Sequence, residues 1–410
     1  MKPALAAALI ATLCLAGTAS AAKPPHRWPS HRVELGLTDS PGGAAALRHS
    51  ARFGFRYQYL AGGVNTGSGW SGWNPDGTFV SMYARESLAH HITPVFTYYM
   101  LRQSLPGRDD GNEPHADLGN LRNTATMRAL FQDFELLLRR ANESHDTEVV
   151  HVEPDMWGYI EQAAKRNDAA TVPVQVSATG LSELAGLPNN AAGLAQAFVR
   201  LRDRLAPHVL LGYMLSVWGS GTDIQYADPP TRQVDGFAAH SVAFFRSLHA
   251  PFDVTFSEFS DRDAAFKQKV YGDGGRSWWK AADFRRNIRF LRDYSRGTGQ
   301  AIVMWQIPVG NTEMRAENNT WGHFQDNRVQ WLLGRNSRSH LRQYRAAGVI
   351  AYLFGGGADG TTCACDRRHD GITDPPAING NTRTSLSADD DGGLFRELAR
   401  RFYRRAALRL

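Results

Sequence analysis

Short runs of apolar, β-branched and aromatic residues recur along the whole chain, and most of them end at Gly, Asp, Asn or Pro. Such runs are typical of strands that are buried on both faces. Eight of these runs are predicted to be strands: Val33–Asp39, Phe55–Ala61, Thr93–Tyr99, Glu148–Asp155, Val209–Trp218, Phe252–Ser260, Gln300–Pro308 and Val349–Phe354. A ninth run, Val172–Ala178, fits either an additional strand or part of a long loop.

Segments in which apolar residues recur at helical spacing separate these predicted strands. A strand followed by a helix, eight times in succession, is the pattern of a (β/α)₈ barrel of the α/β class. No interior linker divides the pattern, so we expect one barrel domain over residues 23–410. The predicted helices are Ala44–Arg52, Val80–His90, Thr124–Asn142, Ala191–Ala206, Gly236–His249, Ala281–Arg296, Gln325–Ala347 and Leu394–Leu408.

Loops that follow the predicted strands are long, whereas loops that lead into them are short. Gly62–Thr78 and Leu101–Asn123 each follow a strand, but only Ala347 and Gly348 precede the last one. Barrel enzymes build their active sites from the loops at the C-terminal ends of the strands. We therefore expect any functional site of this chain at that end of the barrel.

Acidic residues close several of the predicted strands. Because side chains alternate along a strand, His151, Glu153 and Asp155 are predicted to share one face. Glu258 ends the predicted strand Phe252–Ser260 in the same way. Carboxyl groups at such positions are costly unless they are hydrogen-bonded, exposed in a wet cleft or used in acid–base chemistry.

Tryptophan residues gather at the same predicted strand ends, where eight of the ten are found. Flat aromatic faces beside acids and amides suit sugar rings, which offer C–H faces for packing and hydroxyls for hydrogen bonds. Packing in the upper core is the alternative for Trp157 and Trp305, and an ion pair or helix cap is the alternative for Asp39. The candidate substrate-binding residues are Asp39, Trp70, Trp73, Tyr98, Trp157, Trp218, Trp305, Gln306 and Asn311.

The end of the fourth predicted strand resembles that of a known enzyme family. Glu153-Pro154-Asp155 is similar to the Glu-Pro-Asp of family 6 cellulases, in which the aspartate is the general acid. This resemblance implies that Asp155 is the proton donor.

The same region also resembles the large clan of retaining (β/α)₈ glycosidases. The Glu153-Pro154 pair is similar to that clan's fourth-strand end, and Glu258 with its two neighbours is similar to its nucleophile strand. This resemblance implies that Glu153 is the acid/base and Glu258 the nucleophile. Val152 departs from the clan's usual Asn, and Glu258 falls on a seventh strand only if Val172–Ala178 is counted.

Both resemblances imply a glycoside hydrolase that acts on a polysaccharide or oligosaccharide, with Glu258 and either Glu153 or Asp155 as catalytic residues. A carboxyl separation of roughly 5–5.5 Å gives retention of configuration, and roughly 6.5–9.5 Å gives inversion. One alternative is a non-catalytic carbohydrate-binding barrel, which needs no coupled acid pair. Another is a polysaccharide lyase or metal-assisted enzyme for acidic glycans, which would draw on the 40 arginines.

The first 22 residues have the features of a secretory signal peptide: a basic start, an apolar run over residues 4–16 and small residues at positions 19–21. No later segment has the roughly 18 uninterrupted apolar residues of a membrane helix. We therefore expect a secreted protein, extracellular or periplasmic, that acts as a monomer without a membrane partner.

The charge and the cysteines add little chemistry to this prediction. The formal net charge is +6, but the segment Arg396–Leu410 alone holds six Arg and one Glu, so residues 22–395 are close to neutral and a nucleic-acid partner is not expected. After signal cleavage Cys363 and Cys365 remain, and they are predicted to form a disulfide. No cofactor or metal is predicted. The acidic residues of the loop Asp366–Asp374 are suitable calcium ligands, but their spacing is not that of an EF-hand, so the sequence does not decide whether calcium binds there.

Overall fold

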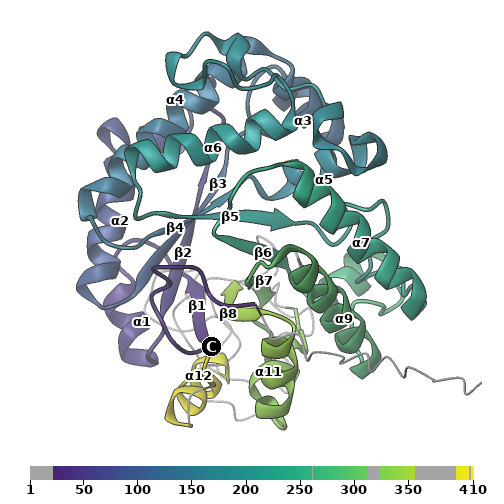
Figure 1. Cartoon of the computed structure of the whole chain (residues 1–410). Helices are drawn as coiled ribbons and strands as arrows, with labels where there is room; N and C mark the ends of the chain where they lie inside the picture. Colours follow the sequence, from purple (N-terminus) through teal and green to yellow (C-terminus); the bar gives the residue numbers. More distant parts are fainter. Residues whose placement is uncertain (1–21, 261, 313–323, 356–393, 406–407) are drawn as a thin grey trace, which may run out of the picture.

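The predicted (β/α)₈ barrel is confirmed. The computed structural model describes residues 22–260, 262–312, 324–355, 394–405 and 408–410. Eight parallel strands pair in chain order, and the last pairs with the first to close the barrel (Figure 1). The strands are β1 (Glu34–Thr38), β2 (Phe55–Ala61), β3 (Thr93–Tyr99), β4 (Val149–Val152), β5 (Leu210–Leu215), β6 (Val254–Glu258), β7 (Ile302–Pro308) and β8 (Val349–Gly355).

Helices surround the barrel and cover its outer face (Figure 1). They are α1 (Ala44–Ser50), α2 (Thr78–Ala89), α3 (Glu113–Leu121), α4 (Thr124–Ala141), α5 (Pro154–Ala163), α6 (Ala191–Leu205), α7 (Thr231–Ser247), α8 (Ala264–Phe266), α9 (Ala281–Thr298), α10 (Arg328–Leu333), α11 (Ser337–Ala346) and α12 (Leu394–Arg404).

Two predicted elements do not form as single elements of the predicted type. The run Val172–Ala178 is not a strand, since its one bridge joins Pro173 to Asn190 outside the barrel. The long helix predicted over Gln325–Ala347 is divided into α10 and α11, because the backbone leaves the helical conformation at Gly334 and is left-handed at Asn336. Helices α3, α5 and α8 are absent from the predicted set.

Strand β4 ends at Val152, three residues before its predicted end. Glu153 has a left-handed backbone with φ 47° and ψ 75°, and Pro154 begins α5. Proline suits the first turn of a helix because its fixed φ is helical and its missing N–H would have no partner there. The prediction that Glu153 and Asp155 share a strand face with His151 is therefore wrong, because neither carboxyl belongs to the strand.

The interior of the barrel is aromatic beneath the C-terminal ends of the strands. The ring of His151 stacks on Phe256, with 4.2 Å between centroids, and meets the edge of Trp305 at 4.7 Å. Burial lowers the pKa of His151 to about 3, so this imidazole is neutral at physiological pH. A neutral aromatic layer thus forms the upper core.

Helix α12 packs beside β1 and β8. Phe395 is buried and contacts Phe354, with 4.4 Å between ring centroids. The last residues of the chain pair with the segment before β1: the N–H of Val33 donates to the carbonyl of Leu408, and the N–H of Leu410 donates to the carbonyl of His31. The end of the chain thus lies beside the start of β1.

Within the described ranges, no helix is long and apolar enough to span a membrane. The predicted signal peptide up to residue 21, the predicted Cys363–Cys365 disulfide and the acidic loop Asp366–Asp374 lie outside the described residues.

Two buried carboxyls away from the C-terminal ends of the strands make stability depend on pH. Glu148 accepts a hydrogen bond from Ser144 Oγ at 2.7 Å, and Glu161 accepts one from Ser241 Oγ at 2.7 Å. Burial raises the pKa of each carboxyl to about 8. The folded chain therefore holds two protons that the unfolded chain releases above about pH 4.5, so stability falls as pH rises from 4.5 to 8.

We expect the Glu148→Gln/Glu161→Gln double variant to lose less stability than the wild type between pH 5 and pH 8. The stability lost between pH 5 and pH 8 should be smaller in the variant by on the order of a few kcal/mol, because neither glutamine side chain ionises. Thermal or urea unfolding at both pH values measures this difference. The control is Glu143→Gln, which changes an exposed carboxyl that forms an ion pair with Arg140. A double variant with the wild-type slope would refute the prediction.

Candidate active site

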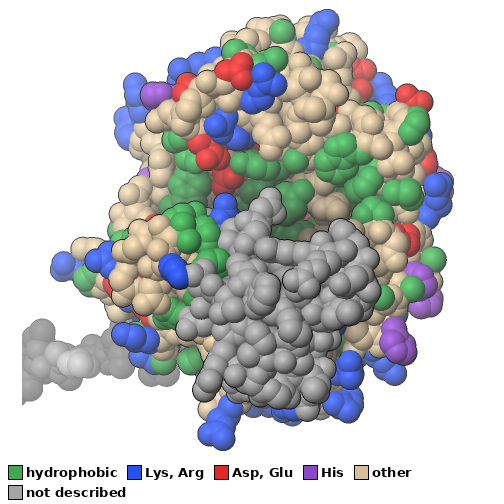
Figure 2. Space-filling view, turned by 180° about the vertical axis from the view of Figure 1, so that it is seen from behind, with side chains coloured by type: hydrophobic (Ala, Val, Ile, Leu, Met, Phe, Trp, Pro, Cys, Tyr) green, Lys and Arg blue, Asp and Glu red, His purple; other side chains and the backbone are tan. Residues whose placement is uncertain are grey.

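The C-terminal ends of strands β2 to β7 surround a cavity of about 530 Å³. Figure 2 shows this face hollowed, with hydrophobic and acidic side chains gathered around the hollow. Four acids, two bases and seven aromatic residues line the cavity. The lining residues are Glu113, Asp155, Asp223, Glu258, Arg262, Lys267, Tyr59, Tyr99, Tyr159, Trp218, Tyr226, Tyr271, Trp305, Pro154, Val217, Gln225, Ser260 and Gln306.

Asp155 enters this cavity from the first turn of α5, where it is half-buried. The hydroxyl of Tyr99, the last residue of β3, makes hydrogen bonds with Asp155 and with Glu113, the latter at 3.3 Å. Burial and the negative charge of Asp155 raise the pKa of Tyr99. The phenol therefore stays protonated and remains a hydrogen-bond donor between two carboxyl groups.

A third carboxyl lies behind this pair. Asp117 of α3 is 1% exposed, and within the described part of the chain neither of its oxygens has a hydrogen-bond partner. Burial, together with the negative charges of Asp155 and Glu113, raises the pKa of Asp117 well above its ordinary value. Asp117 is therefore harder to ionise than an ordinary aspartate.

Glu258 enters the cavity from the last residue of β6, as predicted, and is half-buried. It pairs in register with Trp305 of β7, and its backbone carbonyl accepts a hydrogen bond from Gln225 Nε2 at 2.9 Å. Since Val172–Ala178 forms no strand, Glu258 lies on the sixth strand. The structure thus departs from the retaining clan, whose pattern required a seventh-strand position.

Glu153 does not line the cavity, although the sequence placed it beside Asp155. Its side chain is fully buried, and its Oε1 accepts hydrogen bonds from the backbone N–H groups of Met100 and Leu101, each at 3.0 Å. Burial raises the pKa of Glu153 well above its ordinary value. Through these two hydrogen bonds Glu153 stabilises the turn after β3.

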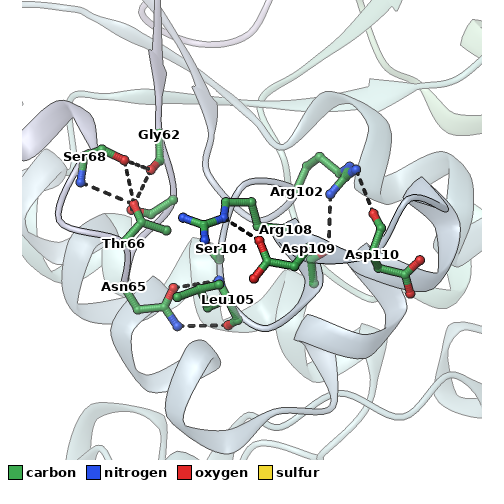
Figure 3. A network of polar contacts seen from close by, with 12 residues as sticks. Gly62, Asn65, Thr66, Ser68, Arg102, Ser104, Leu105, Arg108, Asp109 and Asp110 are labelled. Carbon is green, nitrogen blue, oxygen red and sulfur yellow. Dashed lines mark hydrogen bonds and ion pairs between the residues drawn. The ribbon is translucent and has the colours of Figure 1, made fainter.

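A polar network also stabilises the segment after β3 and joins it to the loop after β2 (Figure 3). Asn65 Nδ2 donates to the carbonyl of Leu105 at 2.9 Å, and the N–H of Leu105 donates to Asn65 Oδ1 at 2.8 Å. Arg102 donates to the carbonyls of Gly107 and Asp110 at 3.3 and 3.2 Å. This network and Glu153 together fix the turn that leads to α3, which carries Glu113 and Asp117.

Three of the nine predicted substrate-binding residues line the cavity, namely Trp218, Trp305 and Gln306. Trp157 does not, because it is fully buried in the core, where its Nε1 donates to the carbonyl of Val152 at 2.9 Å. The alternative role in the upper core therefore holds for Trp157.

Three other predicted binding residues make contacts of their own outside the cavity lining. Trp70 Nε1 and the Tyr98 hydroxyl both bind Asp133 Oδ2, at 2.8 and 2.9 Å, between β3 and α4. Asp39 forms an ion pair with the buried Arg56 at 3.0 Å, which was the expected alternative.

The last two predicted binding residues also lie outside the cavity lining. Trp73 is 47% exposed and packs edge-on against Phe79, with 5.1 Å between ring centroids. Asn311 is 3% exposed.

Sequence reasoning missed the aromatic rim formed by Tyr226 and Tyr271. Tyr226 lies in the loop after β5 and is 38% exposed, while Tyr271 lies after β6 and is 58% exposed. Their position in long loops after strands was the available signal, but the prediction took only tryptophans from those loops. Among the described residues, no three His, Cys, Asp or Glu side chains are grouped so as to hold a metal ion.

No family model and no curated protein matches the sequence. Solved structures similar to this chain include a modular endo-β-1,4-mannanase from Cellulomonas fimi, with 11% identity and a TM-score of 0.45 over 79% of this chain and 64% of the mannanase. The matched part thus spans less than two thirds of the mannanase's length.

Two further structures show a similar level of likeness. A β-glycosidase from Pyrococcus horikoshii has 11% identity and a TM-score of 0.42 over 81% of this chain and 85% of its own. A family 6 glycoside hydrolase from Orpinomyces has 14% identity and a TM-score of 0.31 over 65% and 64%. At these values the likeness assigns no activity to this chain, and the fold rests on the strand pairing described above.

Proposed function

We propose that this protein is a secreted glycoside hydrolase that cleaves a polysaccharide or oligosaccharide in the cavity at the C-terminal ends of its strands. The observation that carries the proposal is that Asp155 and Glu258 line one cavity together with seven aromatic side chains. Cleavage of a glycosidic bond needs one carboxyl that donates a proton and a second that is ionised.

Asp155 is the proposed proton donor. It lies within one group of carboxyls with Glu113 and Asp117, and Tyr99 makes hydrogen bonds with both Asp155 and Glu113. Carboxyls that are close together and partly buried resist full ionisation, so the group favours retention of a proton beside the cavity. A proton held there can pass to the oxygen of the leaving sugar.

Glu258 is the proposed ionised partner, acting either as nucleophile or as the base that activates water. It enters from β6, two strands away from the β4 end that carries Asp155, and both residues line the same cavity. Arg262 and Lys267 line the same cavity, and their positive charges favour ionised carboxyls nearby.

A screen for new reducing ends tests the proposal directly. Purified protein would be incubated with plant, fungal and bacterial polysaccharides, beside the Asp155→Asn/Glu258→Gln double variant as a control. We expect reducing ends from at least one glycan with the wild type and none with the variant. Binding without cleavage would indicate a carbohydrate-binding barrel instead, and unsaturated products would indicate a lyase.

The rim tyrosines give a prediction for substrate binding. Removing the ring in Tyr271→Ala should cost about 1 kcal/mol of sugar packing, or roughly five- to tenfold in KM, with kcat nearly unchanged. Steady-state kinetics on the glycan found in the screen measure both constants. Trp73→Ala is the matched control, because Trp73 is also an exposed aromatic residue but lies outside the cavity lining. An equal rise in KM for both variants would contradict the assignment.

A further inference from the structure

Gln306 has an unusual backbone at the edge of the cavity. Its φ is 49°, in the left-handed region that residues other than glycine rarely adopt. It lies in a bulge, since β7 advances three residues from Met304 to Ile307 while β8 advances two. Bulges of this kind commonly redirect a side chain near a functional site.

The backbone of the bulge keeps its hydrogen bonds with the segment after Glu258, while the side chain of Gln306 points into the cavity. The N–H of Phe259 donates to the carbonyl of Trp305 at 2.8 Å, and the N–H of Ser260 donates to the carbonyl of Gln306 at 3.2 Å. Both donors directly follow Glu258 in the chain. The segment Trp305–Gln306 is therefore hydrogen-bonded to the chain directly after Glu258.

The side chain of Gln306 reaches across the mouth of the barrel to Tyr59. Its Nε2 donates to the Tyr59 hydroxyl at 2.5 Å, although β7 and β2 are separated by β8 and β1 in the barrel. The Tyr59 ring also packs on Trp305, with 5.8 Å between centroids. Tyr59 and Gln306 both line the cavity.

The hydrogen bond from Gln306 leaves the O–H proton of Tyr59 free to be donated elsewhere. The oxygen of Tyr59 accepts from the amide, so its own O–H proton is available to another group. Burial and the nearby negative charges, including those of Asp155 and Glu258, raise the pKa of Tyr59 well above its ordinary value. The phenol therefore remains protonated while it faces the field of both acids.

We propose that Tyr59 donates a hydrogen bond to the reacting groups held between Asp155 and Glu258, and that Gln306 is a positioning residue that acts through Tyr59. The inference rests on the proposed function and adds a donor to it that the sequence did not reveal. It also changes the expected role of Gln306, from a residue that binds substrate directly to one that orients Tyr59.

A kinetic double-mutant cycle tests this inference. Tyr59→Phe is expected to lower kcat about 10- to 100-fold with KM changed less than about threefold, and to shift the pH profile of kcat, because a donor to an ionised group is lost. Gln306→Gly removes the amide while its backbone tolerates the left-handed conformation, so the fold should persist. It should lower kcat in the same direction by a smaller factor.

The double variant separates the two roles of Gln306. If Gln306 acts through Tyr59, Tyr59→Phe/Gln306→Gly should be no slower than Tyr59→Phe alone. Multiplicative losses would overturn the positioning role. Tyr57→Phe is the matched control, since Tyr57 is a buried tyrosine of the same strand that does not line the cavity, and its kinetics should match the wild type.

The outcomes also distinguish this inference from the proposed function. An active wild type with unchanged kcat and pH profile in Tyr59→Phe would overturn the inference and leave the proposed hydrolase standing. A wild type that cleaves no glycan in the screen would refute the proposed function, and the inference with it. Thermal unfolding of each variant verifies that losses of activity do not reflect loss of the fold.

Discussion

Glu258→Gln is expected to lower kcat by at least about a thousandfold while the folded barrel persists, and Asp155→Asn by about a hundredfold to ten-thousandfold. Each change keeps the size of the side chain but removes the carboxyl chemistry. Both residues are half-buried at the cavity, so neither substitution disturbs the core. Initial rates of reducing-end release, with circular dichroism and thermal unfolding, measure the two effects separately.

Substrates with different leaving groups distinguish the proton donor Asp155 from its ionised partner Glu258. An aryl glycoside with a strongly acidic phenol needs no proton to depart, so Asp155→Asn should retain most activity on such a substrate and lose it on the natural glycan. Glu258→Gln should lose activity on both. Full activity of both variants on the natural glycan would exclude this carboxyl pair, and equal losses of Asp155→Asn on both substrates would exclude Asp155 as the acid.

Glu153→Ala is expected to destabilise the fold by about 2–4 kcal/mol, because it leaves two buried N–H groups without an acceptor and opens a space in the core. The N–H groups are those of Met100 and Leu101, which Glu153 Oε1 now satisfies. Glu153→Gln keeps an oxygen at that position and should retain nearly full stability and activity. Urea unfolding and the rates of glycan cleavage check these two expectations.

This pair of variants also tests the alternative assignment. If Glu153 were the acid/base, as the resemblance to the retaining clan implies, Glu153→Gln would lose turnover while remaining folded. Stability lost only in the alanine variant, with activity kept in the glutamine variant, would support the structural role.

The barrel itself could be read from the sequence with good accuracy. Strands β2 and β3 begin and end where their apolar runs predict, and every strand of the closed barrel was anticipated. The error at β4 has a local cause. His151, Glu153 and Asp155 alternate at the period of a strand, so Glu153-Pro154-Asp155 resembled the end of β4, whereas the chain turns at the left-handed Glu153 and begins α5 at Pro154.

The candidate site could be predicted only in part, because both faces of a parallel strand in a barrel are buried. The hydrophobic pattern therefore does not tell the inward face from the face that meets the helices. Tyr98 and Tyr99 are neighbours at the end of β3, yet Tyr98 contacts α4 and Tyr99 lines the cavity. The Gln306–Tyr59 contact joins residues 247 positions apart through a bulge, which periodicity does not reveal.

The pairing of the last residues with the segment before β1 has a practical consequence for handling this protein. Because Leu410 and Leu408 bind His31 and Val33 at the end of the barrel opposite the cavity, a linker added after Leu410 would emerge far from Asp155 and Glu258. Immobilisation on a solid support through that linker would leave the cavity facing the solution, where a long polymer could still enter it.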